Sequence, residues 1–575
     1  MTDTIATHLL RVAKSHPDRP FLQTPTETLS YSQAVIRVAG TAKRFADLGL
    51  RRGDFIACYC ESQVAGLFFS LACATTGIRP APLSPVFSVD YLISGIAGAL
   101  NARAIFCDID RTPLLVEHRC RPLCFAPAQT DVPGAEIIEE TFDLQFGEAL
   151  EYLERASHGI GPDDVFMILP TAGSTGTPKL VVRRHVSFTR YLKYLGQELG
   201  PGLEDGTPHR FLMVSALTHA FGYHLLTTAI GLGATLALTS KIDTEADLVE
   251  IRALDPTVLP LLPRVQRSLF RQHFAKPETE LATKAQMFSA SARFVCSAGG
   301  IPNYDILKYL MDQGLDIVEF YGSTEASLIA ITKRGTWKPG CSGKVVDDVE
   351  VKRDPDGEIL VRSAGVTPGY FGDDEATRAV ITNDGYFHTG DHGELAPDRS
   401  LSIVGRKKDV FNTSEGTNIF PTRIEQMIEL LPWVHQVCLV GDARPFLTAL
   451  IVVKDEGNLR NPREYGFLEA ASNVEVYRRA GSDLSDINLR LERIEHIVRF
   501  ALFGREFPTD IYAKVSAGKI RRDRKVFNER FRAVIEMLYT SRPQPIPDPS
   551  FVPGTDRRLR MRGKDRRLAP RAGKR

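Results

Sequence analysis

The chain has 575 residues, 43% of them hydrophobic and 25% charged, and its formal net charge is +1. These values are typical of a soluble globular protein with more than one domain, and they exclude a general electrostatic attraction to nucleic acid. Residues 1–20 lack the apolar core of a secretory signal, and the longest apolar stretch, Ala65–Ala74, is too short to span a bilayer, so we expect a cytoplasmic protein without stable membrane insertion.

The first part of the chain with a clear pattern is residues 164–325, where short β-rich runs alternate with amphipathic segments of helix length. The runs are Val165–Leu169, Phe211–Val214, Thr235–Leu238, Arg293–Cys296 and Ile317–Phe320. Such alternation predicts parallel sheets with helices packed on them. Loops 170–171, 298–300 and 321–322 each follow a run, and ligands of open α/β sheets collect at the carboxyl ends of strands. We therefore expect these loops to share one crevice.

The pattern changes to hairpins between residues 345 and 404. The segments Val349–Arg353 and Glu358–Arg362, joined by Asp354-Pro-Asp-Gly357, predict strand, turn and strand. After Arg406 we expect a smaller unit with both strands and helices. Its strands are predicted at Gln436–Val440 and Thr448–Val453, and its helices near Asp486–Phe503 and Lys525–Tyr539.

The predicted fold is α/β with three parts. Residues 1–406 form a large domain of parallel-type sheets covered by helices, with a β-rich subdomain, and residues 407–540 form a small mobile α+β domain. Residues 541–575 form a basic tail, and its last twenty residues hold ten Lys or Arg and two Asp. Because few apolar residues are available for burial there, we expect this tail to be disordered, either as a solvated terminus or as a docking segment for an anionic partner.

The nine cysteines are scattered and do not show the spacing of a secreted disulfide scaffold. Even the cluster of His118, Cys120 and Cys124 lacks the second ligand pair of a structural zinc site. We interpret all nine as reduced thiols.

The first chemical motif is Thr171-Ala-Gly-Ser-Thr-Gly-Thr-Pro-Lys179, a glycine-rich loop with many hydroxyls. Glycines let backbone N–H groups turn toward anionic oxygens, hydroxyls add donors and Lys179 adds a positive charge. It is not a Walker A loop, because Leu180 follows the lysine where that pattern requires Ser or Thr. The alternative is an ordinary surface loop, but the buried-type strand before it favours phosphate binding.

The second motif, Tyr321-Gly-Ser-Thr-Glu325, offers a flat ring for a base, hydroxyls for a phosphate and a carboxylate for Mg²⁺. A helix start capped by Ser323 or Thr324 is the alternative. Two further motifs are Tyr386-Phe-His-Thr-Gly-Asp391 and Gly405-Arg-Lys-Lys-Asp409. They supply Asp391, a carboxylate that can accept both ribose hydroxyls, and Arg406, a planar guanidinium. These two residues alone also fit a strand-end salt bridge.

The fifth motif, Ser516-Ala-Gly-Lys-Ile-Arg521, places Lys519 near the end of the small domain. The five motifs, in this order, resemble the adenylate-forming superfamily of acyl-CoA synthetases, peptide-synthetase adenylation domains and beetle luciferases. The resemblance covers roughly residues 29–525. It implies that a carboxylate attacks the α-phosphate of ATP to give acyl-AMP and pyrophosphate. A thiol, that of CoA or of a carrier-protein phosphopantetheine, then takes the acyl group.

The resemblance also implies a role for each motif residue. Tyr321 and Gly322 would lie against adenine, Thr324 at the α-phosphate and Glu325 at Mg²⁺. Asp391 and Arg406 would hold the ribose, and Lys519 would bridge the carboxylate and the α-phosphate. Lys408 matches the hinge of the small domain. The residues implied for the phosphate loop are Thr171, Ser174, Thr175, Gly176, Thr177 and Lys179.

The segment 217–223 resembles the acyl-pocket segment of luciferases and acyl-CoA synthetases. It suggests His219 and Phe221 as lining residues, although a lone His in an apolar run is as often a core residue. Gly299, Gly300 and Ser323 complete the implied pocket. Amino-acid adenylation domains usually place an Asp in this segment to pair the ammonium, and none occurs between residues 215 and 223. We therefore expect a fatty or aryl acid as the small-molecule substrate, and the predicted helix near Asp486–Phe503 also favours a fatty acid.

The predicted activity is that of an AMP-forming acid–thiol ligase. CoA is favoured as acceptor because the interval between the Tyr321 and Asp391 motifs is compact, whereas fatty acyl-AMP ligases carry an added segment there. The alternatives are an acyl-AMP ligase that loads an acyl carrier protein, a luciferase-like oxidoreductase and a non-catalytic binding protein. The intact set of charged motif residues argues against the last. A carboxylate reductase would need carrier and nicotinamide domains, for which the chain has no room.

Overall fold

The computed structural model divides the chain into two compact units, each with its own hydrophobic core. Unit 1 comprises Met1–Val410 and Asp510–Asp523, and unit 2 comprises Phe411–Thr509 and Arg524–Arg575. The structure describes residues 3–84, 87–126, 130, 132–139, 142–172, 178–213, 217–239, 245–263, 265–266, 287–454, 467–468, 473–508, 511–515 and 519–540. Side chains are described for all of these except 172, 178, 245–246, 512–515 and 519–522.

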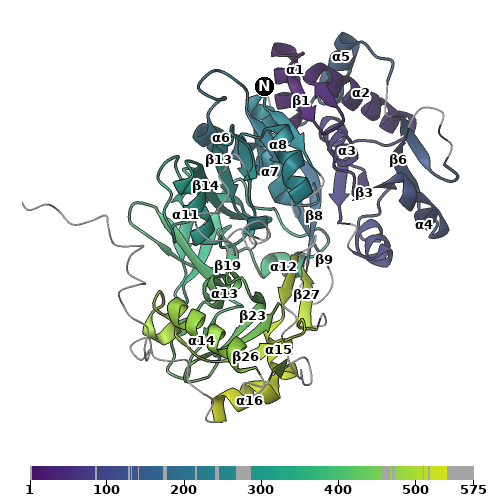
Figure 1. Ribbon diagram of the computed structural model, residues 1–575. Helices are drawn as coiled ribbons and strands as arrows, with labels where there is room; N and C mark the ends of the chain where they lie inside the picture. The colour runs from purple at the N-terminus through teal and green to yellow at the C-terminus, as the bar shows by residue number, and fades with distance from the viewer. Residues whose placement is uncertain are drawn as a thin grey trace, which may run out of the picture. The chain divides into compact units, whose positions relative to one another are not determined.

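A nine-stranded sheet forms the centre of unit 1 (Figure 1). The strands from β14 to β1 run parallel, and β2, β15 and β16 at the edges run antiparallel to their neighbours. The parallel sheet confirms the predicted fold class, and the predicted runs from 211 onward are strands with small differences at their ends. The order across the sheet is β16 (Lys344–Val345), β15 (Ser327–Ile331), β14 (Asp316–Ser323), β13 (Phe294–Ser297), β12 (Val258–Pro260), β10 (Arg210–Met213), β11 (Thr235–Leu238), β1 (Pro20–Gln23) and β2 (Thr28–Ser30).

A second, five-stranded sheet of unit 1 is parallel throughout. Its order is β4 (Arg79–Pro82), β3 (Phe55–Tyr59), β5 (Ala104–Cys107), β6 (Pro122–Ala126) and β7 (Glu136–Glu139). The α-helices described in this unit are α1 (Ile5–Ser15), α2 (Tyr31–Asp47), α3 (Gln63–Thr76), α4 (Thr112–Glu117), α5 (Phe146–Ala156), α6 (Val186–Leu199), α7 (Ala220–Leu232), α8 (Glu245–Leu254), α11 (Tyr304–Asp312) and α12 (Asp374–Arg378). The buried helix α7 ends at Gly233, whose φ of 66° would strain any residue with a side chain.

The predicted strand at 165–169 exists, but its place in the fold was predicted wrongly. β8 (Val165–Ala172) pairs with β9 (Pro178–Arg184) in an antiparallel two-stranded sheet and is not part of a parallel one. Only a short segment joins the two β-rich runs, and parallel neighbours need a crossover of about a dozen residues or more. A second hairpin of unit 1, β27 (Tyr512–Val515) with β28 (Lys519–Arg522), lies against β8.

The β-rich part of unit 1 is a four-stranded antiparallel sheet. Its order is β17 (Glu350–Arg353), β18 (Glu358–Arg362), β19 (Phe387–Leu395) and β20 (Leu401–Arg406). The predicted hairpin at 349–362 is confirmed, and Gly357 in its turn has φ 91°, which favours glycine.

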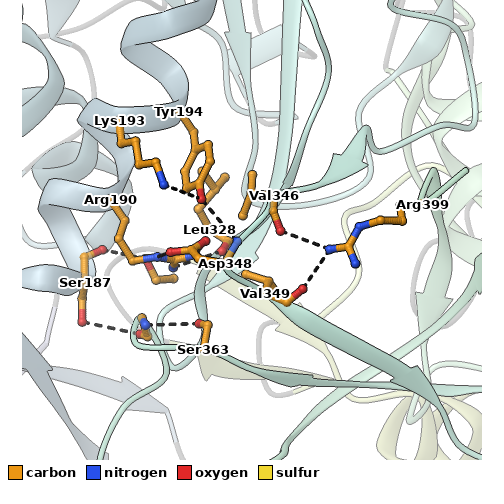
Figure 2. A network of polar contacts seen from close by, with 12 residues as sticks. Ser187, Arg190, Lys193, Tyr194, Leu328, Val346, Asp348, Val349, Ser363 and Arg399 are labelled. Carbon is orange, nitrogen blue, oxygen red and sulfur yellow. Dashed lines mark hydrogen bonds and ion pairs between the residues drawn. The ribbon is translucent and has the colours of Figure 1, made fainter.

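Buried and partly buried polar contacts fasten this antiparallel sheet to the rest of unit 1. Figure 2 shows Arg190 of α6 donating from Nε and Nη2 to the two carboxylate oxygens of Asp348, both at 2.6 Å. Its Nη1 also donates to the carbonyl of Leu328 in β15 at 3.3 Å. Arg399, in the turn between β19 and β20, donates to the carbonyls of Val346 and Val349 at 3.2 and 2.9 Å. These bonds hold two sheets that both supply predicted site residues.

Unit 2 is a smaller α+β structure. Its four-stranded sheet has the order β23 (Val434–Val440), β24 (Leu447–Val453), β26 (Ile497–Phe503) and β25 (Phe467–Leu468), and β21 (Phe411–Asn412) pairs with β22 (Asn418–Ile419). Its α-helices among the described residues are α13 (Pro421–Glu429), α14 (Val474–Asn488), α15 (Arg524–Arg530) and α16 (Arg532–Thr540). The predicted final helix near 525–539 is therefore two helices.

The helix predicted near Asp486–Phe503 is wrong. The helix α14 ends at Asn488, and β26 begins at Ile497 as the parallel neighbour of β24. The Asn488 side chain bonds both backbone groups of Ile497, donating to its carbonyl at 3.0 Å and accepting from its N–H at 2.9 Å. The apolar run 497–503 fits either a helix or a strand, and sheet pairing decides between them. The preference for a fatty acid drawn from that helix therefore has no support.

Among the described residues, no helix is both long enough and apolar enough to span a membrane. All nine cysteines are free thiols, and seven of them are buried.

Candidate functional site

The carboxyl end of β14 carries Tyr321, Gly322 and Ser323, and the turn into β15 carries Thr324 and Glu325. The neighbouring parallel strand β13 ends just before the exposed Gly299 and Gly300. Two of the three predicted loops therefore lie at the same edge of the nine-stranded sheet. The third, at 170–171, lies in the β8–β9 hairpin.

Gly322 makes the tight turn after β14 possible. A Cβ at this position would lie 2.0 Å from the carbonyl oxygen of Ser327, so no larger residue fits without moving backbone. Within the turn, the Ser323 hydroxyl accepts a hydrogen bond from the N–H of Ala326 at 3.0 Å. Thr324 and Glu325 are half-buried in this turn.

Three predicted nucleotide-binding residues lie together in unit 1. Asp391 of β19 and Arg406 of β20 are direct partners across the antiparallel ladder, and the Arg406 Nε lies 2.9 Å from the Asp391 Oδ1. The Tyr321 hydroxyl donates to the other carboxylate oxygen of Asp391 at 2.6 Å. Arg406 also donates to the carbonyl of Thr389 at 3.0 Å. Residues far apart in sequence thus form one polar cluster.

The environment of Asp391 is unusual for a carboxylate. The residue is only 4% exposed, whereas about half of the Arg406 side chain is exposed, at 52%. Burial raises the pKa of the Asp391 carboxyl, and Arg406 and the Tyr321 hydroxyl oppose this shift. Burial and the nearby carboxylate also raise the pKa of Tyr321 well above its ordinary value, so its hydroxyl stays a donor.

A second cluster joins Lys179 to Glu325 through Tyr370. The Tyr370 hydroxyl donates to Glu325 Oε1 at 3.4 Å, and the Lys179 ammonium lies 4.6 Å from the centre of the Tyr370 ring. Burial is the main cause that raises the pKa of Tyr370, and the Glu325 charge adds to it. Tyr370 was not predicted, since it lies outside all five motifs and only the fold brings it to them.

The backbone of Glu325 is held from a different side. Its carbonyl accepts hydrogen bonds from the N–H of Thr367 at 2.6 Å and from Nη1 of Arg183 at 3.1 Å. Arg183 is completely buried and also donates to the carbonyl of Gly365. A buried arginine bonded to two carbonyls fixes the turn that carries Glu325, and the sequence offered no signal for it.

The Glu325 carboxylate fits the role of a Mg²⁺ ligand. The half-buried carboxylate forms an ion pair with no cation among the described side chains, and its one described side-chain contact is the Tyr370 hydroxyl. No group of three or more His, Cys, Asp or Glu that would form a protein-only metal cage exists among the described residues. Mg²⁺ is commonly held by one or two carboxylates together with nucleotide phosphates, which suits a lone glutamate.

The predicted acyl-pocket residues lie at the start of α7. His219 is its N-cap residue and is half-buried, and Phe221 stacks on Phe320 of β14 with 5.7 Å between ring centres. Because side chains alternate along a strand, Phe320 and Tyr321 project from opposite faces of β14. The aromatic contact at Phe221 and the polar cluster at Tyr321 therefore flank the same strand end.

Some predicted residues lie outside what the structure describes. They are Ser174, Thr175, Gly176 and Thr177 of the glycine-rich loop and the side chain of Lys519. The described ends of that loop, Thr171 and Lys179, are partners in the β8–β9 ladder. Lys519 begins β28 opposite Val515, in the hairpin that belongs to unit 1. Lys408 is exposed in the turn after β20.

One buried carboxyl near the site has a strongly shifted pKa. Glu319 lies two residues before Tyr321, is 4% exposed and accepts a hydrogen bond from Trp337 Nε1 at 2.8 Å. Burial raises its pKa from 4.5 to about 7, although the Trp337 bond opposes the shift. The folded state then holds this proton more tightly than the unfolded state. Stability from this group is complete at low pH and is lost as pH rises through about 7.

We predict that Glu319→Gln removes this pH dependence. Between about pH 4 and pH 8, the wild type should lose about 3 kcal/mol more of its free energy of unfolding than the variant does. Urea denaturation at a series of pH values measures the difference. Glu394→Gln, an exposed residue of β19, is the matched control and should follow the wild type. Parallel curves for Glu319→Gln and the wild type would contradict the prediction.

Known proteins resemble this chain in sequence along most of its length. Residues 9–371 match the AMP-binding enzyme family, and residues 408–543 match the AMP-binding enzyme C-terminal domain. A long-chain-fatty-acid–CoA ligase of Mycobacterium bovis is 24% identical, with 93% of this chain and 97% of that protein covered. A 2-succinylbenzoate–CoA ligase of Bacillus cereus is 25% identical, with 76% of this chain and 86% of that protein covered.

A solved structure shows the same fold. The A domain of carboxylic acid reductase from Segniliparus rugosus, in complex with AMP and a co-purified carboxylic acid, has a TM-score of 0.71 at 19% identity, and 94% of each chain is covered. The comparisons confirm the predicted superfamily, the α/β fold and the enzyme class, an acid–thiol ligase that forms acyl-AMP from ATP and a small carboxylic acid. By its sequence from residue 9 to 371, the chain belongs to the AMP-binding enzyme family.

Proposed function

We propose that this enzyme joins a fatty or aryl acid to CoA through an acyl-AMP intermediate, using the residues described above. The observation that carries the proposal is the convergence of two clusters on the end of β14. Tyr321, Asp391 and Arg406 form one of them, and Glu325 and Lys179 meet at Tyr370 in the other. One cluster suits a nucleoside, and the other suits phosphates.

At the nucleoside end, Asp391 accepts the ribose hydroxyls and Arg406 orients the carboxylate, while the Tyr321 ring lies against the base. Charge-assisted hydrogen bonds of this kind are about twice as strong as neutral ones. At the phosphate end, Lys179, Thr171 and the loop 173–177 bind the phosphate oxygens, and Thr324 donates to the α-phosphate. Glu325 would hold Mg²⁺, which supplies positive charge to the phosphates when bound.

The two reactants are held in place for attack without a protein nucleophile. The acid lies beside Phe221 and His219, with Gly299, Gly300 and Ser323 at the strand ends, so that its carboxylate points to the α-phosphate. Holding two reactants in attack geometry is worth about 7–11 kcal/mol. Lys519 neutralises the charge that the carboxylate and the α-phosphate bring together.

The choice of acid and of acceptor rests on sequence. No aspartate stands between residues 215 and 223 to pair an ammonium group, and relatives named as ligases of long-chain fatty acids and of 2-succinylbenzoate use CoA. A carrier-protein phosphopantetheine is the competing acceptor. A cytoplasmic location also stays a prediction. The predicted disorder of the basic tail stays one as well, because residues 541–575 lie outside the described part of the chain.

We also propose Lys408 as the hinge of a mobile small domain formed by residues 407–540, although the strands β27 and β28 of that stretch group with unit 1 in this structure. The preceding residue is held firmly in unit 1, because the Lys407 ammonium pairs with Glu358 at 2.9 Å and with Asp356, and its N–H donates to the carbonyl of Gly390 at 2.9 Å. Lys408 itself is exposed, so rotation can begin there.

ATP-dependent hydroxamate formation across fatty, aryl and amino acids tests the substrate class. We expect product with fatty or aryl acids and none with amino acids. Product formed with CoA but not with a holo carrier protein would identify the acceptor, and the reverse result would replace CoA by the carrier. If none of the acids in the panel caused release of pyrophosphate, the proposal would be rejected.

A further inference from the structure

Tyr370 contacts the two charged residues that are proposed to act on the phosphates. Its hydroxyl lies 3.4 Å from Glu325 Oε1 and its ring lies 4.6 Å from the Lys179 ammonium. The bond to Glu325 is long for an O–H donor, so the tyrosine orients the carboxylate but does not hold it rigidly. Cation–π attraction of the kind seen at Lys179 holds an ammonium over a ring face.

Tyr370 is itself fixed by its backbone. The N–H of Phe371 donates to the carbonyl of Leu180 at 2.7 Å, and Tyr370 pairs with Val181 of β9 as an isolated bridge. The Tyr370 N–H donates to the Thr377 hydroxyl at 2.9 Å. The residue is only 6% exposed. This ring is therefore tied to the strand that begins beside Lys179.

Lys179 and Glu325 carry opposite charges and do not form an ion pair with each other among the described contacts, although both contact the Tyr370 side chain. A direct pair would occupy the carboxylate that is needed for a cation and the ammonium that is needed for a phosphate. We propose that Tyr370 is a positioning residue that keeps Lys179 and Glu325 apart and aims Glu325 at a divalent cation. This role rests on the proposed function of the site, and it concerns how the site binds metal and nucleotide.

Two substitutions separate the parts of this role. Tyr370→Phe keeps the ring and removes the hydroxyl, whereas Tyr370→Leu removes both. The readout is binding of α,β-methylene-ATP measured by calorimetry over a series of Mg²⁺ concentrations, which needs no turnover. For Tyr370→Phe, we expect the Mg²⁺ concentration that gives half-maximal binding to rise about tenfold, while affinity at saturating Mg²⁺ is unchanged.

For Tyr370→Leu, we expect weaker analogue binding even at saturating Mg²⁺, because Lys179 can then pair with Glu325. Added KCl should reduce the defect relative to the wild type, since salt screens an ion pair near the surface. In a Glu325→Gln background, Tyr370→Phe should cause no further change in the Mg²⁺ dependence, as coupled residues are not additive.

Tyr386→Phe is the matched control. Tyr386 also donates to a glutamate, Glu350 at 3.1 Å, and its ring also lies under a lysine, Lys352 at 3.8 Å, but its described contacts include neither Lys179 nor Glu325. It should bind the analogue as the wild type does. If thermal denaturation shows that Tyr370→Leu is not folded, the result for Tyr370→Phe alone tests the proposal.

An unchanged Mg²⁺ dependence in Tyr370→Phe would overturn the proposal, as would an effect that persists in full in Glu325→Gln. These outcomes differ from a failure of the proposed function, which would appear as a wild type that binds the analogue but releases no pyrophosphate with any acid. A wild type whose analogue binding ignores Mg²⁺ would reject the role of Tyr370 outright.

Discussion

Lys519→Ala should slow the formation of acyl-AMP by about 10²- to 10³-fold, the loss seen when one charge-stabilising donor is removed from an active site. The acid carboxylate and the α-phosphate are both anionic, and at about 4 Å they repel by roughly 4 kcal/mol at an effective dielectric near 20. A lysine between them offsets this repulsion. The hairpin 510–523 that carries Lys519 belongs to the same compact unit as Tyr321 and Asp391, and β27 lies against β8.

The two half-reactions are measured separately. Exchange of pyrophosphate into ATP reports adenylation, and thioester formation from synthetic acyl-AMP and CoA reports thiol transfer. We expect thiol transfer to be largely retained in Lys519→Ala. The control is Lys514→Ala, which should keep both half-reactions. Lys514 is the other lysine of the hairpin and is in register with Ile520. Equal loss of both half-reactions in Lys519→Ala would reject the assigned role.

The second large effect is expected at Asp391. Asp391→Ala should lower kcat/KM for ATP by about 10²-fold, because hydrogen bonds to a charged group contribute about 1.5–3 kcal/mol each. The apparent KM for the acid substrate should change little, since the Asp391 carboxylate contacts Tyr321 and Arg406 at the proposed nucleoside end of the site. Steady-state kinetics with each substrate varied in turn measures this split.

A modified substrate shows whether Asp391 acts on the ribose or only supports its neighbours. The wild type should use 2′-deoxy- and 3′-deoxy-ATP poorly, and Asp391→Ala should lose most of that discrimination. A variant that discriminates as strongly as the wild type would show a structural role only. Asp398→Ala, in the exposed turn of the same sheet, removes an aspartate paired with Lys344 and should leave ATP kinetics unchanged.

Local features of the sequence were predicted well where neighbouring residues decide the structure. The hairpin Glu350–Arg353 and Glu358–Arg362 follows from turn residues and alternation alone. The carboxyl ends of β14 and β13, near Tyr321 and Gly299, follow from short apolar runs bounded by glycine. Asp391 and Arg406 were predicted as ribose ligands, and the structure places them opposite each other across one ladder.

Predictions that needed distant partners were less successful. The run 497–503 reads equally as helix or strand, and its pairing with β24 and the Asn488 side chain make it a strand. The strand at 165–169 was assigned to a parallel sheet, although its neighbour is the nearby run Pro178–Arg184. In both cases the residues themselves allow two structures, and contacts from elsewhere select one.

The sequence by itself determined the reaction class, because short motifs carry the groups proposed to bind the nucleotide and each motif needs only its own neighbours to be recognised. Only the tertiary structure decided which groups meet. Tyr370 joins Lys179 to Glu325, and the buried Arg183 fixes the turn of Glu325, through contacts between segments far apart along the chain. Burial and side-chain proximity are properties of the packed chain, so no local pattern encodes them.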